Sequence, residues 1–237
     1  MKFKHQQWSE ELQEVLDGYI AIHDPIICSD ALRTHYENSR LIEIAGLGYR
    51  VQEEEKGRSV SEEDVSKFRQ EWIEEFVSQG LVGVMTYRRQ MIVISVTLLE
   101  AMLKNFVSSY FYEKPESMYP FVGDCSGSVS FKDVLKYETK SEYVSHLSES
   151  AAQKFISQKW SVLFKSLNKL IKSEIPNKEN LIEIAKLRND IIHEGAKIEI
   201  SNEYVFSSFD IVRELIEFLA KKSNKSSQGT QQSCAPA

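Results

Sequence analysis

The sequence predicts an all-α protein. Glycine and proline are scarce, with 10 and 5 copies among 237 residues, and this scarcity favours long helices over turns. Nearly every long segment also repeats its apolar residues at helical spacing rather than in strict alternation. Hydrophobic residues make up 42% of the chain and aromatic residues 11%, as in soluble globular proteins, and the chain is long enough to bury a core.

Four helices are expected in the N-terminal half. The first covers residues 8–22 and stops before Pro25. The second covers residues 29–55, where the glycines of Gly46–Gly48 would introduce a kink. Ser61 is followed by three acidic residues, a typical N-cap, and opens a third helix whose apolar stripe runs to Val77. The fourth and longest, over residues 87–112, is apolar on most of its circumference, as expected of a helix surrounded by others.

The C-terminal half continues the helical pattern. Residues 113–130 contain two prolines and two glycines and are predicted to form a loop. Helices are then expected over 131–137, 148–171, 177–193 and 204–222, the third of these ending just before Gly195. Residues 197–200 alternate and predict a short extended segment. Residues 223–237 are polar and lack periodicity, so we expect a disordered tail.

Charge divides the chain into two parts. Residues 1–80 hold 9 Lys/Arg against 17 Asp/Glu, a balance of −8, while residues 81–237 hold 20 against 18, a balance of +2; together they give the net charge of −6. The sequence therefore predicts an acidic helical extension over 1–80 and a helical bundle over 81–222. A polyanionic ligand is expected to bind the second part.

Several features bear on the compartment. Three widely spaced cysteines are present, Cys28, Cys125 and Cys234. Their odd number and spacing indicate reduced thiols rather than a disulfide framework or a zinc site. The most apolar run, Met91–Val107, contains Glu100 and Lys104 and is interpreted as a buried helix rather than a membrane span. With no secretory signal at the N-terminus, we expect a cytoplasmic protein that contacts no membrane and holds no metal or cofactor.

The densest cluster of reactive side chains lies near the C-terminus. It comprises Arg188, Asn189, Asp190 and His193, followed by Gly195. A guanidinium offers a planar fork for phosphate oxygens, and an imidazole accepts or donates a proton near neutral pH. The neighbouring amide and carboxylate can orient the ring. These are the kinds of group with which RNA is cut without a metal ion.

The helical positions of these residues allow two interpretations. At about 100° per residue, Arg188 falls in the middle of the apolar stripe, where a guanidinium must be paired or reach a wet cleft. Asn189 and His193, four residues apart, share another face and can act as a pair. Alternatively, Arg188 is a structural anchor to an acid such as Glu100, and His193 is merely a cation favoured near a helix C-terminus.

The sequence resembles the HEPN superfamily, whose signature is an arginine, a polar residue, three to five further residues and a histidine. Arg188, Asn189 and His193 fit that signature. The helix order over residues 81–222 is also similar: a long apolar helix with a central acid at Glu100, further helices, the motif helix, an irregular piece and a last amphipathic helix. The resemblance implies a HEPN-like up-and-down bundle with residues 1–80 as an N-terminal extension.

The resemblance further implies a metal-independent endoribonuclease. His193 would transfer protons, Arg188 would hold the phosphate and Asn189 would orient the histidine or the substrate, with Asp190 and Glu100 as supports. One chain offers a single suitable histidine, and HEPN proteins commonly dimerise with their motifs facing each other, so a homodimer is implied. The setting implied is a bacterial toxin or phage-defence effector that acts on RNA and is silenced by an antitoxin or other regulatory partner.

Two rival interpretations remain. A HEPN-like domain that no longer cuts would bind RNA or assemble partners, and a purely helical scaffold would have no nucleic-acid role. Other candidate groups are weaker: Lys165, Lys169 and Lys172 form a basic row that could guide RNA, or simply a solvated face. Arg88 and Arg89, before the long helix, are a further basic pair. His23, Cys28 and His35 could suggest a metal site, but their spacing matches no usual set of metal ligands.

Overall fold

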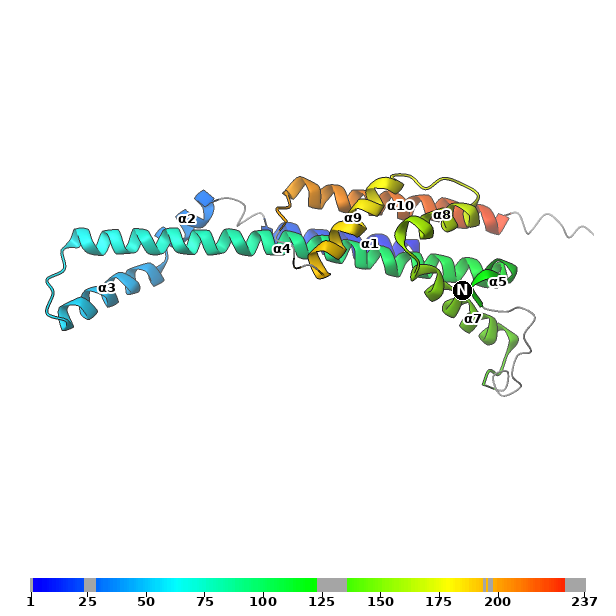
Figure 1. The fold of residues 1–237 in the computed structure, drawn as a ribbon, viewed down its shortest axis with the longest axis horizontal. Helices are drawn as coiled ribbons and strands as arrows, with labels where there is room; N and C mark the ends of the chain where they lie inside the picture. The colour runs from blue at the N-terminus through cyan, green and yellow to red at the C-terminus, as the bar shows by residue number, and fades with distance from the viewer. Residues whose placement is uncertain (1, 24–28, 123–135, 194, 196–197, 229–237) are drawn as a thin grey trace, which may run out of the picture. The chain divides into compact units, whose positions relative to one another are not determined.

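The computed structural model of the chain describes residues 2–23, 29–122, 136–193, 195 and 198–228, and this described part is all-α, without a strand (Figure 1). The chain divides into two compact units. Unit 1 comprises Met1–Val15 and Met91–Ala237, and unit 2 comprises Leu16–Gln90. This division differs from the expected boundary at residue 80, because the first fifteen residues pack within unit 1. Helices α1 (His5–His23) and α4 (Glu62–Glu113) contribute to both units.

Unit 1 is built around the second half of α4. Its buried residues recur at alternating steps of four and three, as in helix bundles: Ile92, Val96, Leu99, Leu103 and Phe106, each at most 2% exposed. By length and composition α4 could cross a membrane, but 56% of its most apolar window is buried within the protein, although Ile94 is exposed. A core helix with one solvent-facing side has this arrangement.

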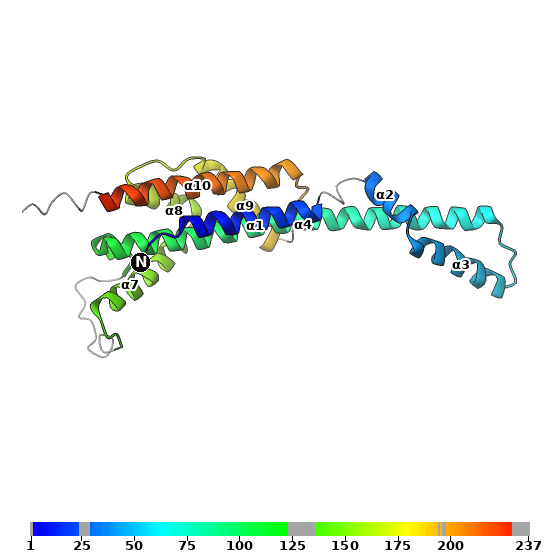
Figure 2. The ribbon, with the colours of Figure 1, turned by 180° about the vertical axis from the view of Figure 1, so that it is seen from behind.

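The remaining helices of unit 1 cover this core. They are the 3₁₀ turn η2 (Pro115–Met118), α5 (Tyr119–Val122), α7 (Lys140–Ile156), α8 (Trp160–Ile171), α9 (Lys178–His193) and α10 (Asn202–Gln228). Helix α10 runs beside the start of α1 in both ribbon views (Figures 1 and 2), and Arg213 donates a 3.0 Å hydrogen bond to the Gln13 side chain.

The first residues of the chain are fixed in unit 1 by specific contacts. The Phe3 ring, 3% exposed, meets the edge of Phe106 at a centroid distance of 5.2 Å. The Asn105 side-chain oxygen accepts 3.2 Å hydrogen bonds from the Lys4 backbone N–H and the Trp8 indole N–H. These contacts explain why the N-terminus belongs with the C-terminal helices.

Unit 2 contains α2 (Ser29–Glu37), α3 (Arg40–Glu55) and the first half of α4. One hydrophobic cluster in this unit consists of Leu32, Ile42, Ile73 and Val77, with Tyr36, Phe76 and Leu81 packed around it. The opposite face of α3 is different, because four apolar side chains are more than half exposed there: Leu41, Ile44, Leu47 and Val51. Their spacing places them along one side of the helix.

Most expected helices are present, with different limits. The N-cap at Ser61 is confirmed: its hydroxyl accepts from the Asp64 N–H at 3.1 Å, and the Asp64 carboxylate accepts from the Ser61 N–H at 3.0 Å. The helices expected over 61–77 and 87–112 are one continuous helix. The segment 29–55 breaks at Asn38 and Ser39, where Ser39 caps α3, and not at Gly46–Gly48, which are helical.

The C-terminal half differs in similar ways. The helix expected over 148–171 is two helices, because the chain leaves the helix between Ser157 and Lys159. Part of the expected loop 113–130 is helical, as η2 and α5. Residues 198–200 have no regular structure, and α10 continues through 223–228, the first part of the expected tail. Residues 229–237, Lys197, the three cysteines and most of the helix expected over 131–137 lie outside the described residues.

Candidate functional site

Helix α9 holds the motif residues and is anchored by its apolar side. Leu181, Ile184 and Ala185 are buried, and the helix packs against α8 and α10. Before its first turn, the Asn177 side-chain amide donates a 2.5 Å hydrogen bond to Glu214 on α10. At its other end Gly195 has φ +60°, the left-handed conformation that glycine adopts without strain, which confirms the predicted helix stop.

Arg188 lies at the edge of the core, with 24% of its side chain exposed. Its Nη1 donates a 3.0 Å hydrogen bond to the Asn189 amide oxygen, and its Nη2 lies 3.9 Å from Oε2 of Glu100 on α4. The Nε–H is buried and has no hydrogen-bond partner within the described residues. The structure therefore brings Arg188, Asn189 and Glu100 together.

The guanidinium retains free hydrogen-bonding capacity in this arrangement. A separation of 3.9 Å is an ion pair but too long for a hydrogen bond, so Glu100 balances the charge without engaging the planar fork. A buried donor without a partner is costly, by roughly 1–3 kcal/mol. Because the Nε is buried, an anionic oxygen could approach only the exposed part of the side chain, where Glu100 leaves Nη2 without a hydrogen bond.

His193 occupies the last turn of α9 and is exposed, as is Ile192 beside it at 46%. It stands one turn beyond Asn189 on the same face, as the sequence predicted. Within the described part of one chain no hydrogen bond joins its ring to Arg188, which bonds Asn189 instead. A single copy therefore presents the imidazole and the guanidinium on separate parts of the helix.

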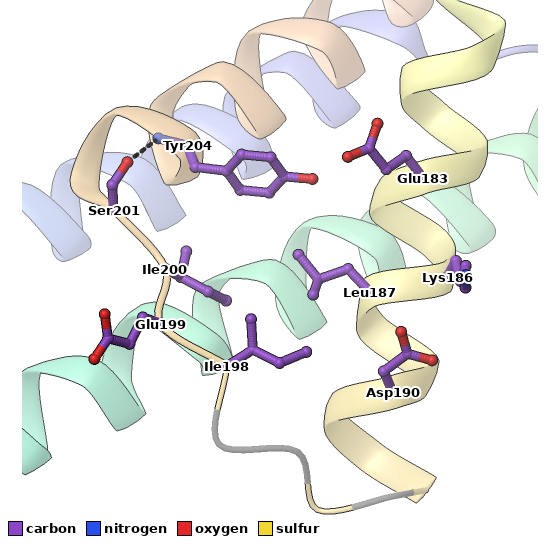
Figure 3. Close-up of a pocket in the computed structure, with 9 residues that line it drawn as sticks. All are labelled: Glu183, Lys186, Leu187, Asp190, Ile198, Glu199, Ile200, Ser201 and Tyr204. Atoms are coloured by element: carbon purple, nitrogen blue, oxygen red, sulfur yellow. Dashed lines mark hydrogen bonds between the residues drawn. The ribbon is translucent and has the colours of Figure 1, made fainter.

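Asp190 does not join the Arg188 cluster. It is half-buried and lines a neighbouring cavity of about 470 Å³ between α9, residues 198–201 and the start of α10 (Figure 3). The other polar groups there include Glu183, Lys186 and Tyr204. Burial raises the pKa of the Tyr204 phenol above its usual value of 10.0, and the nearby negative charge of Glu183 raises it further.

Sequence reasoning missed this cavity. The available signal was the spacing of Glu183, Lys186 and Asp190, which recur at i, i+3 and i+7 and share one face of the motif helix. The other wall comes from residues 198–204, and nothing in their sequence pattern places them against α9.

The remaining candidates have ordinary surroundings. Lys165, Lys169 and Lys172 are exposed in a row on and just after α8. In unit 2, Arg88 donates to the His23 imidazole through Nε at 3.1 Å and Nη2 at 2.9 Å. Arg89 bonds Thr86 at 2.9 Å. Across the described part of the chain, no group of three His, Cys, Asp or Glu side chains is arranged to hold a metal ion.

Comparisons with known proteins find no matching family model and no curated protein or solved structure with significant similarity.

Proposed function

We propose that the protein is a metal-independent endoribonuclease of the HEPN type, active as a homodimer. The observation that carries the proposal is the cluster of Arg188, Asn189 and Glu100 on the same helix as the exposed His193. A half-buried guanidinium whose Nη2 lies too far from Glu100 for a hydrogen bond, together with an accessible imidazole, is suited to a phosphodiester.

In the proposed reaction, the ribose 2′-OH attacks the adjacent phosphorus. A neutral His193 imidazole takes the 2′-OH proton as the 2′-O–P bond forms, and an imidazolium gives a proton to the 5′-oxygen as the P–O5′ bond breaks. The products are a 2′,3′-cyclic phosphate and a 5′-OH. Arg188 stabilises the charge on the phosphorane oxygens, and Glu100 and Asn189 hold the guanidinium in place.

Acid and base require two imidazoles. One chain contributes one His193, so a second copy related by two-fold symmetry would supply the other imidazole and a second Arg188. The exposure of His193 and Ile192 at the end of α9 supports a contact between copies there. An antitoxin or other regulatory partner would then restrain cleavage in a toxin or defence setting.

The test is RNA cleavage by the purified full-length protein in EDTA, with analysis of the product ends. We expect His193→Ala to lower the rate by about 10²–10⁴-fold, as for loss of a general acid–base group. The matched control is His35→Ala, a change at an exposed histidine on α2. Equal rates for His193→Ala and the parent, or a strictly monomeric active protein, would remove the proposal.

A non-catalytic assembly module is the second candidate. The exposed apolar row on α3, formed by Leu41, Ile44, Leu47 and Val51, favours it, since such rows usually meet a partner. Expression in bacteria separates the two candidates: the enzyme arrests growth and His193→Ala relieves the arrest, whereas an assembly module is harmless in both forms.

A further inference from the structure

We propose that the cavity beside the motif (Figure 3) binds the nucleobase next to the cleaved phosphate, and that this base is guanine. The inference rests on the proposed endoribonuclease function, for which it supplies the sequence preference. It begins from position: Asp190 lines the cavity, follows Asn189 directly and precedes His193 by one helical turn. A nucleotide held at His193 therefore has the cavity within reach of its base.

The cavity has the size and the walls of a small-ligand site. Its volume of about 470 Å³ falls within the range of roughly 300–1,000 Å³ that is usual for such sites. Figure 3 shows the apolar side chains of Leu187, Ile198 and Ile200 converging on its centre. Tyr204 stands across from α9 and provides an aromatic face, on which unpaired RNA bases commonly stack.

The charges in the cavity exclude a phosphate and favour a base. Three carboxylates, of Glu183, Asp190 and Glu199, line the cavity with one ammonium, of Lys186. Phosphate oxygens would be repelled by this excess of negative charge, whereas carboxylates accept hydrogen bonds from the N–H groups of a base. The polar groups therefore point to a base that presents adjacent N–H donors.

Guanine matches the pair formed by Glu183 and Lys186. These residues are three apart on α9 and both line the cavity, so one base can be reached by a carboxylate and by an ammonium from neighbouring turns of the helix. Guanine alone among the RNA bases presents two adjacent donors, N1–H and N2–H, next to two acceptors, O6 and N7. The donors suit the Glu183 carboxylate and the acceptors suit Lys186, because lysine commonly reads that edge of guanine. Adenine, cytosine and uracil each place an acceptor beside the donor that a carboxylate would bind.

Tyr204 is held opposite Glu183 in its protonated form. In Figure 3 its hydroxyl faces the Glu183 carboxylate across the cavity. Burial and that carboxylate both raise the pKa of the phenol, so the ring stays uncharged at neutral pH. A neutral ring stacks on a base without adding further negative charge to the cavity.

Binding is tested separately from cleavage, on full-length protein carrying His193→Ala. The probes are the dinucleoside monophosphates GpU, ApU, CpU and UpU, titrated by calorimetry. We expect GpU to bind about tenfold or more tightly than the other three. Adding Glu183→Gln or Lys186→Met should remove that difference, whereas Glu179→Gln, a matched change in the exposed first turn of α9, should preserve it.

Cleavage of a mixed-sequence RNA by protein with an intact His193, followed by mapping of the product ends, completes the test. Cuts beside guanine should dominate, and Glu183→Gln should abolish the preference while cuts at other sites continue. If the protein cleaves RNA without a guanine preference, the guanine site is wrong and the proposed endoribonuclease function is retained. If it prefers GpU but cleaves no RNA, the guanine site is retained and the endoribonuclease function is wrong. A preference that persists in both Glu183→Gln and Lys186→Met overturns the assignment.

Discussion

The two units of the chain are stabilised by different interactions. Of the twelve largest fully buried side chains in the described residues, eleven belong to unit 1 and one, Tyr19, to unit 2. Unit 2 relies more on close ion pairs: Arg33 with Glu74 through two hydrogen bonds of 2.6 and 2.8 Å, Arg50 with Glu62, and Glu53 with both Lys56 and Arg58. Unit 1 also has a close pair, Arg213 with Asp210 at 2.6 Å.

This difference is informative because the two kinds of interaction contribute unequally to the free energy of unfolding. Burying one large apolar side chain contributes about 1.5–3 kcal/mol, whereas an exposed ion pair contributes about 0–1 kcal/mol and weakens with salt. Unit 1 is therefore expected to give α9 a rigid support across a broad range of conditions. Unit 2 should respond more strongly to pH and ionic strength.

The largest expected effect compares three leucines. Leu103 in unit 1 is 0% exposed, Leu32 in unit 2 is 7% exposed, and Leu47 on α3 is 58% exposed. Leu103→Ala should lower the free energy of unfolding by about 3–4 kcal/mol and Leu32→Ala by about 2–3 kcal/mol, because each leaves a cavity. Leu47→Ala should cost less than about 0.5 kcal/mol. Urea unfolding followed by circular dichroism measures all three, and equal losses at Leu103 and Leu32 would break the comparison.

The second prediction uses two glycines of α3 that are two residues apart. A Cβ at position 48 would meet no atom within 4 Å, so Gly48→Ala should raise the free energy of unfolding by about 0.5–1 kcal/mol, the usual gain for alanine within a helix. A Cβ at position 46 would overlap the Arg69 side chain, whose Nε is buried. Gly46→Ala should therefore bring no gain. Thermal unfolding of the two variants would contradict this account if both were stabilised alike.

The smallest effect concerns acid sensitivity of unit 2. Hydrogen bonds from Lys56 and Arg58 lower the pKa of the Glu53 carboxyl below its ordinary value of 4.5. A carboxyl with a lowered folded-state pKa stabilises the protein above 4.5, and this contribution is lost as the pH falls through the folded pKa. Glu53→Gln should thus be less stable than the parent at pH 7, and the difference should shrink as the pH is lowered from 4.5 to 3.

Urea unfolding at the two pH values measures this effect. Glu54→Gln, the same change at the exposed neighbour, is the matched control for removing one negative charge. A difference between Glu53→Gln and the parent that stayed constant from pH 7 to pH 3 would show that the ion pairs of unit 2 do not contribute as described.

Local signals in the sequence sufficed for the helical class and for the motif helix. The helix expected over 177–193 is observed over Lys178–His193, because proline before it and Gly195 after it act on the nearest few backbone groups. The signal for the N-cap at Ser61 is equally local, because the cap involves only Ser61 and Asp64, three residues later. The neighbourhood of Arg188 and Glu100 was anticipated as one alternative, and the contact is observed at 3.9 Å.

The errors came where tertiary packing overrides local preference. A helical glycine costs only about 1 kcal/mol, so α3 continues through Gly46, which lies buried against Arg69, and α4 continues through Gly80 and Gly83. Conversely, the chain leaves the helix at Ser157 without any glycine or proline. The cavity beside Asp190 was missed because one of its walls is an irregular segment.

Unit 2 is a topological insertion, since the chain leaves unit 1 after Val15 and re-enters it at Met91. Deleting residues from the N-terminus would therefore remove Phe3 and the hydrogen bonds to Asn105 from unit 1, which contains the motif helix α9. A minimal fragment should instead retain both chain ends and omit an interior stretch, with a designed turn joining the cut helices. A change in the length of the inserted stretch would likewise leave the C-terminal end of α9 with its own supporting helices.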